Sequence, residues 1–217
     1  MDKPNLATDP YLGRLPLHAL DLLIPALCAV NQEAANWTKT HESGMSELQN
    51  ACCYIIPNAV QISLSIRELI RSGYLFSAKI LIRSLVERVL VISVFQKKPE
   101  KIEKWLKTKG TNNKPSYAEM LESIEEFKRF SEIEGVDMIT LIKGYIDDLH
   151  SVVHVDVLGL HQNTLLTSEG ELRYLSGADH NNPLLADEVC QQTLIFITLL
   201  MSRIAQIFPE ISARRAD

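Results

Sequence analysis

The chain has 217 residues, of which 46% are hydrophobic and 23% are charged. This composition can fill one sizeable core and excludes a disordered or fibrous chain. A formal net charge of -5 excludes the overall basic character that is typical of nucleic-acid-binding domains. We therefore expect a single helical domain over residues 1–217, in which residues 1–14 form a flexible N-terminal arm.

The cysteines and the N-terminus indicate the compartment. Cys28, Cys52, Cys53 and Cys190 lie in apolar segments and show no C-x-x-C spacing, as expected for small core residues in a reducing environment. The N-terminal segment "MDKPNLATDP" lacks the apolar core of a secretory signal. The apolar runs are interrupted by charges or shorter than the ~20 residues that a bilayer requires. We expect a cytoplasmic protein without a membrane segment.

Two long helices are predicted in the first third of the chain. The first covers residues 15–37 and should be bent or broken at Pro25, because a proline inside a helix removes a hydrogen bond and clashes with the preceding turn. The second covers residues 46–71, with a kink expected at Pro57. It should end at Gly73, which suits a left-handed C-terminal cap.

The third predicted helix, "LFSAKILIRSLVERVLVISVFQ" at residues 75–96, is apolar on nearly every side apart from one narrow polar stripe. Such a helix is expected in the middle of a bundle. A shorter helix should follow from Pro99 to about Lys109. The basic segment at residues 97–109 holds six lysines and two glutamates and could contact phosphates or an acidic partner. Glu and Lys at helical spacings favour the plainer interpretation, a solvated helix surface.

The second half of the chain continues the helical pattern with one interruption. Ser116 should begin a helix that ends near residue 134, with Glu119 three residues on as in a capping box. A further helix is predicted over residues 137–160. Weak alternation then predicts a small β-hairpin at about residues 165–175, before a final helix over residues 184–208. The predicted fold is an all-α bundle of about six or seven helices with one small hairpin.

The polar stripe of the third helix is the first candidate site. Lys79, Arg83 and Glu87 recur at steps of four and therefore share one helix face. An unpaired charge inside an apolar bundle costs several kcal/mol, so Arg83 and Glu87 must pair with each other or with groups on neighbouring helices. Two interpretations remain open: an ion pair that fixes helix register, or a functional pocket lined by both residues.

The stretch "YIDDLHSVVHVDVLGLH", residues 145–161, is the second candidate. Asp147, His150 and His154 have the i, i+3, i+7 spacing that would bring a carboxylate and two imidazoles to one helix face, where they could bind a metal. Di-iron bundles, however, need paired Glu-x-x-His motifs and two further glutamates, and this chain has a single relative of that motif. The alternatives are packing and an acid–base role for His154.

Other common chemistries lack their motifs. The sequence contains no G-x-S-x-G elbow, and no cysteine has a histidine nearby in sequence. Its nine glycines form neither a P-loop nor a G-x-G-x-x-G fingerprint. We expect no nucleotide cofactor and no cofactor of another kind.

The segments "SGYLFSAKILIRSLVERVLVISVF" and "YIDDLHSVVHVD" make the chain similar to a bacterial family of all-helical domains of unknown function. The resemblance covers roughly residues 71–175, including the hairpin. The first motif of that family is matched by Arg83 and Glu87. The second motif is matched by Tyr145, Leu149, Ser151 and His154.

More distantly, that family resembles the abortive-infection and HEPN-like helical bundles of toxin and phage-defence systems. In those bundles a dimer brings Arg and His together to cleave RNA, on a helix where Arg precedes His by four to six intervening residues. This sequence departs from that pattern, because no Arg precedes His150, His154 or His161 at that distance. If RNA is cleaved, Arg83 and His154 have to meet from different helices.

The resemblance implies a cytoplasmic bacterial defence-type or toxin-like effector, with metal-independent RNA cleavage as its candidate reaction. We expect Arg83, Glu87, Tyr145 and His154 to line one polar pocket, in which Arg83 stabilises phosphate charge, His154 moves a proton and the other two orient them. The alternatives are a non-catalytic dimeric helical interaction module and a metal-dependent helical-bundle enzyme. The final helix carries "LIFITLLM", which favours a homodimer. RNA or another protein is the other expected partner.

Overall fold

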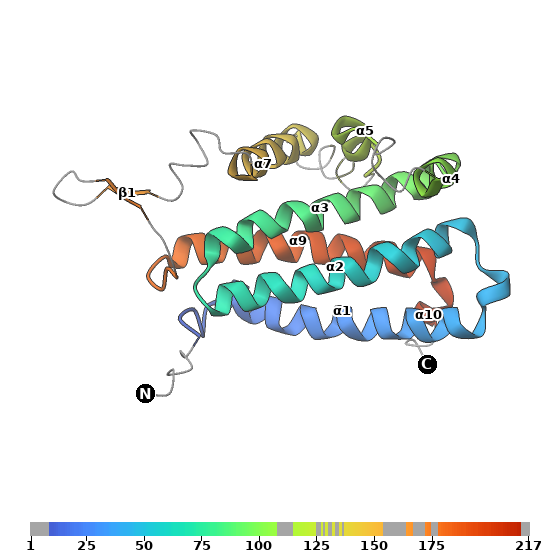
Figure 1. Ribbon diagram of the computed structural model, residues 1–217, viewed down its shortest axis with the longest axis horizontal. Helices are drawn as coiled ribbons and strands as arrows, with labels where there is room; N and C mark the ends of the chain where they lie inside the picture. Colours follow the sequence, from blue (N-terminus) through green and yellow to red (C-terminus); the bar gives the residue numbers. More distant parts are fainter. Residues whose placement is uncertain are drawn as a thin grey trace.

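In the computed structural model, four long helices form a bundle that a second layer of shorter helices covers (Figure 1). The long helices are α1 (Leu15–Thr40), α2 (Glu47–Arg71), α3 (Leu75–Lys97) and α9 (Pro183–Ile207). The prediction of an all-α fold is confirmed. The described residues are 9–107, 115–124, 127, 129, 132, 135, 137–153, 164–166, 172–174 and 178–213.

The shorter elements complete this arrangement, and α4, α5 and α7 lie on the side of α3 opposite to α1 (Figure 1). β1 and β2 pair antiparallel, with Thr164 opposite Tyr174. The shorter elements are η1 (Glu42–Gly44), α4 (Glu100–Lys107), α5 (Tyr117–Glu122), α7 (Met138–Val153), β1 (Thr164–Leu166), β2 (Leu172–Tyr174) and α10 (Pro209–Ala213).

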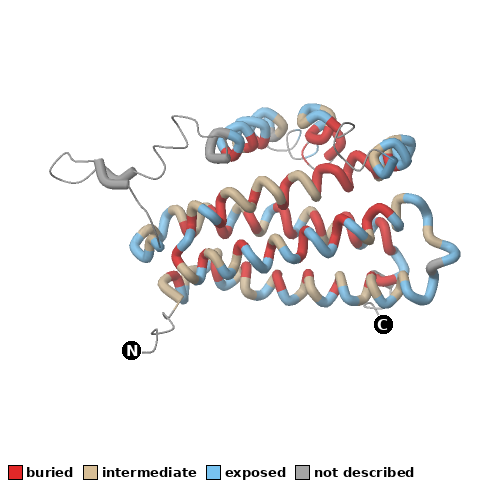
Figure 2. Tube along the Cα trace, in the orientation of Figure 1, coloured by how far each residue is buried: buried red, intermediate tan, exposed pale blue. Residues whose placement is uncertain are grey.

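The helix α3 is the centre of the fold, as its sequence predicted. Figure 2 shows buried positions along its whole length, and every residue from Val89 to Phe95 is buried. The aromatic ring of Phe95 packs edge to face against Trp105 of α4, with 5.4 Å between ring centroids. A helix covered on both sides needs apolar residues on both sides, which explains its nearly continuous apolar sequence.

Both internal prolines are accommodated without interrupting their helices. The helix α1 continues through Pro25 to Thr40, and α2 continues through Pro57. Of the two alternatives predicted at Pro25, the break is wrong, while the bend stays a prediction, as does the kink at Pro57. Packing of these long helices against α9 and α3 outweighs the hydrogen bond that each proline removes. A capping box between Ser46 and Gln49 begins α2.

Part of the expected N-terminal arm packs against the bundle. Tyr11 is 3% exposed, and its hydroxyl donates a hydrogen bond to the backbone oxygen of Asp179. Arg14 forms an ion pair with Asp187 of α9. Residues of the expected flexible arm that lie in the described part, 9–14, therefore contact the bundle, while residues 1–8 lie outside it.

The helices of the second layer differ in length from their predictions. The helix α5 ends at Glu122 rather than near residue 134. Its cap, Ser116, accepts a hydrogen bond from the backbone N–H of Glu119 at 3.3 Å, while the Glu119 carboxylate binds Lys98 and Lys101 instead of completing a capping box. The described part of α7 ends at Val153, so the rest of the helix predicted over residues 137–160 lies outside the described residues.

Two of the described helices, α1 and α9, are long and apolar enough to span a membrane by length and composition. Core helices meet the same criterion, and 39% of the apolar window of α9 is buried in the bundle. A cytoplasmic location therefore stays a prediction.

Gly73 ends α2 with a left-handed cap, as predicted. Its φ is +77°, and the hydrogen bonds from Gly73 N–H to Ile70 and from Tyr74 N–H to Leu69 form a Schellman motif. The turn also meets the segment before α9, because Asp179 N–H donates to the Gly73 carbonyl at 2.8 Å. Gly73 thereby joins the α2–α3 turn to the start of α9.

Gly73→Ala is expected to destabilise the protein by about 1–3 kcal/mol, because an L side chain is strained at this φ. The added Cβ would also lie 2.8 Å from the imidazole of His180 and 3.0 Å from the backbone oxygen of Asp179. Chemical denaturation measures the change in the free energy of unfolding. Gly44→Ala is the matched control, because a Cβ there meets nothing within 4 Å. An equal effect of the two substitutions would contradict this account.

Candidate functional site

The predicted pairing of Arg83 with Glu87 occurs on the face of α3 that meets the second layer. The Nε atom of Arg83 lies 3.6 Å from Oε1 of Glu87, and the two side chains are 15% and 21% exposed. Arg88 approaches the other carboxylate oxygen of Glu87 at 3.9 Å. The pair is thus partly buried but still open to solvent.

The helix α7 adds a histidine to this pair. Ile146 and Leu149 are buried, which holds α7 against α3 and places the neighbouring His150 beside Arg83. Nη1 of Arg83 lies 2.5 Å from Nδ1 of His150. Because a guanidinium can only donate, Nδ1 is the acceptor and the neutral ring carries its proton on Nε2. His150 itself is exposed.

The helix α5 contributes Tyr117 from a third direction. Its hydroxyl donates a hydrogen bond to Oε1 of Glu87, and its ring centroid lies 5.7 Å from the guanidinium carbon of Arg83. Burial raises the pKa of Tyr117 to about 12, and the hydrogen bond to the Glu87 carboxylate adds to this effect. Arg83, Glu87, Tyr117 and His150 are called the Arg83 cluster below.

Tyr117→Phe is expected to remove a stability loss that the wild type shows at high pH. Tyr117 keeps its proton in the folded chain up to about pH 12, whereas the unfolded side chain ionises near 10.0. Its contribution to stability is therefore complete below pH 10 and is lost as the pH rises towards 12. Unfolding free energies measured from pH 9 to 12 should fall less steeply in Tyr117→Phe. Parallel curves for the two proteins would contradict the burial of this hydroxyl.

Tyr145 belongs to a different group of polar side chains. Its hydroxyl donates to Oε1 of Gln192 at 2.7 Å, and the Gln192 amide donates to Glu188 at 2.9 Å. Lys79 binds the same Glu188 oxygen at 3.0 Å. Burial raises the pKa of Tyr145, and its ring stacks on Phe196. The described contacts therefore place Tyr145 on the α7–α9 side, not with Arg83.

Of the two histidines near the end of α7, His150 is described by the structure and His154 is not. His154 follows the last described residue of α7 and lies outside the described residues, as does His161, so the meeting of Arg83 with His154 stays a prediction. His150 is the histidine that contacts Arg83. Helical periodicity predicted both histidines on one helix face and could not indicate which of them contacts Arg83.

The metal interpretation rests on Asp147, His150 and His154. Among the residues that the structure describes, no group of three or more His, Cys, Asp or Glu side chains could hold a metal ion. Asp147 and His150 are both exposed, and His154 lies outside this comparison. A metal site stays an alternative prediction.

The geometry defines a class of protein, an all-helical bundle with a polar cluster where α3, α5 and α7 meet. A sequence profile for a family of unknown function (DUF5677) matches residues 49–171, more than half of the chain, and the chain belongs to this family. The matched part contains the whole Arg83 cluster. No curated protein and no solved structure matches the chain. The predicted resemblance to a family of unknown function is confirmed, while the more distant resemblance to HEPN-like bundles stays a prediction.

Proposed function

We propose that the protein is a metal-independent ribonuclease whose active site is the Arg83 cluster. The observation that supports this most directly is the contact between the Arg83 guanidinium and the His150 imidazole. Cleavage of a phosphodiester needs a fixed positive charge for the phosphate and a group that transfers protons. Glu87 and Tyr117 hold Arg83 from its other side, so its orientation is set before RNA binds.

In the proposed reaction, RNA supplies its own nucleophile, the 2′-hydroxyl. Phosphate oxygens accept hydrogen bonds from Arg83, which frees the Nδ1 lone pair of His150 to take the proton of the 2′-hydroxyl. The 2′ oxygen bonds to phosphorus as the bond to the 5′ oxygen breaks, leaving a 2′,3′-cyclic phosphate and a 5′-hydroxyl. His154, predicted one helical turn from His150, protonates the leaving oxygen.

The test is to incubate the purified protein with RNA and with DNA of the same sequence, each in the presence of EDTA. We expect cleavage of RNA alone, with cyclic phosphate ends, because DNA lacks the 2′-hydroxyl. Cleavage that EDTA abolishes would instead support the metal-dependent alternative. Intact RNA after incubation with a folded wild-type protein would overturn the proposal.

The cellular role that we propose is that of a cytoplasmic defence-type or toxin-like effector. This rests on the more distant resemblance of the chain's family to abortive-infection and HEPN-like bundles, in which a dimer cleaves RNA. An enzyme that cuts RNA without a cofactor suits such a role, because its activity depends only on its own folding and on access to RNA.

A homodimer is proposed on a separate observation, which also favours the interaction-module alternative. On α1, Leu15 and Leu22 share one face and are 78% and 64% exposed. On α9, Leu184 and Ile195 share a face and are 79% and 47% exposed. Exposed apolar side chains on two adjacent helices are typical of an interface.

Ile195→Glu is expected to convert the dimer to a monomer, because the new carboxylate would be buried at the interface without a partner. Light scattering after size-exclusion chromatography measures the mass. Leu106→Glu is the matched control, since Leu106 is 44% exposed but lies on α4. A monomeric wild type, or dimers of both variants, would contradict this interface.

A further inference from the structure

The guanidinium of Arg88 extends the Arg83 cluster across α3 towards α2. Its Nη1 atom lies 3.9 Å from Oε2 of Glu87, while Nε of Arg83 lies 3.6 Å from Oε1 of the same carboxylate. Arg83 also contacts His150 of α7, and Arg88 contacts Asn58 of α2. The helices α7 and α2 lie on opposite sides of α3, so this row of polar contacts crosses α3 (Figure 1).

The hydrogen bonds of Arg88 go to neutral acceptors. Its Nε atom donates to Oδ1 of Asn58 at 2.7 Å, and its Nη1 atom donates to the backbone oxygen of Ser84 at 3.0 Å. Among the described residues, Glu87 is the one acidic side chain that Arg88 approaches, and 3.9 Å is too long for a hydrogen bond. Arg83 and Arg88 thus flank a single carboxylate, and the three side chains together carry a net positive charge.

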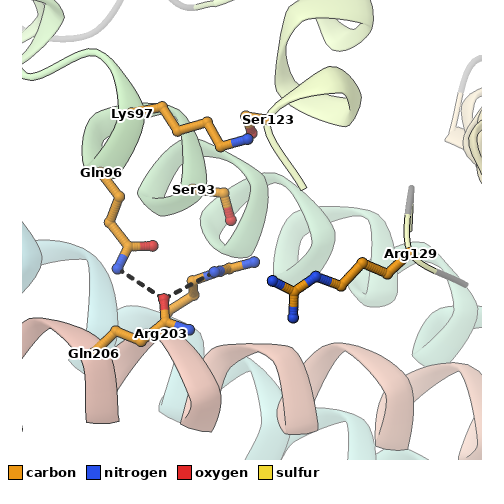
Figure 3. Close-up of a pocket in the computed structure, with 7 residues that line it drawn as sticks. All are labelled: Ser93, Gln96, Lys97, Ser123, Arg129, Arg203 and Gln206. Atoms are coloured by element: carbon orange, nitrogen blue, oxygen red, sulfur yellow. Dashed lines mark hydrogen bonds between the residues drawn. The ribbon is translucent and has the colours of Figure 1, made fainter. Parts of the chain in front are cut away.

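Arg88 is also accessible at the surface. Its side chain is 33% exposed, and Asn58 beside it is exposed. Arg203 of α9 shows the opposite arrangement, because it is 7% exposed and donates to Gln206 beside a cavity of about 270 Å³ between α3 and α9 (Figure 3). A strand that lies on the surface of the bundle can therefore contact Arg88, whereas Arg203 belongs to the interior.

We propose that Arg88 binds the phosphate next to the one that is cleaved, an inference that rests on the ribonuclease function proposed above. A single strand follows a row of positive groups through its backbone. Asn58 and Ser84 hold one edge of the Arg88 guanidinium, and no described residue accepts a hydrogen bond from its Nη2 atom. That atom can donate to a phosphate oxygen. The substrate is then an RNA strand with a second phosphate beside the scissile one, rather than a dinucleotide.

The plainer explanation is that Arg88 only ties α3 to α2 through its hydrogen bond to Asn58. This accounts for the Nε contact but gives the positive charge no part, since a neutral donor would serve equally well. The two explanations differ in one measurable respect. A phosphate contact makes RNA binding more sensitive to salt, whereas a tie between two helices does not.

Binding of a short RNA strand that cannot be cleaved tests the proposal. Methyl groups on the 2′ oxygens of this strand block the nucleophile, and the fluorescence anisotropy of a labelled strand gives Kd over a series of salt concentrations. Arg88→Gln should weaken binding about tenfold at low salt, the usual contribution of a hydrogen bond to a charged group. The slope of log K against log salt should become shallower by about 0.7, the value of one phosphate contact on a single strand.

Two variants are the matched controls. Asn58→Ala removes the hydrogen bond to Arg88 but keeps the cation, so it should keep the wild-type slope. Arg71→Gln removes an exposed arginine that is paired with Glu68 in the last turn of α2, and it should bind as the wild type does. The proposal is overturned if the wild type does not bind the strand, if Arg88→Gln keeps the wild-type slope, or if Asn58→Ala changes the slope as much as Arg88→Gln does.

Cleavage of ordinary RNA separates this proposal from the ribonuclease function. Arg88→Gln should raise KM for long RNA and keep kcat, because it removes a contact that substrate and transition state share. Wild type and variant should cleave a dinucleotide equally, since a dinucleotide has only the scissile phosphate. Binding that depends on Arg88 without any cleavage would overturn the ribonuclease function and keep Arg88 as a phosphate-binding residue. Cleavage with the same KM in wild type and Arg88→Gln would overturn the role of Arg88 alone.

Discussion

His150→Ala is expected to lower the rate of RNA cleavage by about 10²- to 10⁴-fold, the usual contribution of a general acid–base group. The melting temperature should hardly change, because His150 is exposed on the surface of α7. The expected loss follows from the position of the imidazole next to the Arg83 guanidinium. The measurement is the initial rate of cleavage at saturating RNA, made on wild type and variant with equal melting temperatures.

Asp147→Ala is the matched control, since Asp147 is exposed on the same helix three residues before His150. It should cleave RNA at the wild-type rate. His154→Ala, run alongside, tests the prediction that His154 also transfers a proton, and it should be impaired as well. Equal cleavage by the wild type and His150→Ala would remove His150 from the mechanism.

Phe95→Ala should have the largest effect on stability, a loss of about 3–5 kcal/mol in the free energy of unfolding. Phe95 is fully buried where α3 meets α4, and its ring packs edge to face on Trp105. Truncation removes this contact and leaves a cavity that α3, held on both sides, cannot close. Denaturant unfolding at constant pH gives the value directly.

Tyr54→Ala provides the comparison, because Tyr54 on α2 is also aromatic but is 73% exposed. Its effect should stay within about 0.5 kcal/mol. If Phe95→Ala were as mild as Tyr54→Ala, the two-sided burial of α3 would be contradicted.

The position of α3 and the pairing on its stripe were predictable, because both follow from the cost of placing apolar residues in water and charges in a core. A helix that is apolar nearly all round has to be covered on two sides. The ion pair between Arg83 and Glu87 follows from the same reasoning, since neither side chain could be buried alone.

The rest of the site depends on contacts between distant segments. Tyr117 reaches Glu87 because α5 packs against α3, which helical periodicity within a segment cannot indicate. His150 meets Arg83 through the register of α7 on α3. The sequence did hold one indication that Tyr145 and His154 do not share a pocket. They are nine residues apart, about 180° around a helix, so a single helix could hardly bring both side chains to the same place.

The Arg83 cluster fits both interpretations that the sequence left open. As a structural ion pair it ties α3 to α5 and α7, and its loss would weaken the fold. As an active site it presents a partly exposed guanidinium and an exposed imidazole to solvent. The second interpretation is the one that we propose, because a substrate can reach an exposed imidazole beside a partly exposed guanidinium.

The most direct test of the central claim, that Arg83 and His150 act together on RNA, is a double-mutant cycle of cleavage rates. Wild type, Arg83→Gln, His150→Ala and the double variant are compared at a temperature where all four are folded. Our account predicts that the double variant is about as slow as the slower single variant, since groups that act as one unit are not additive. Losses that multiply, or a wild type without RNA cleavage, would contradict it.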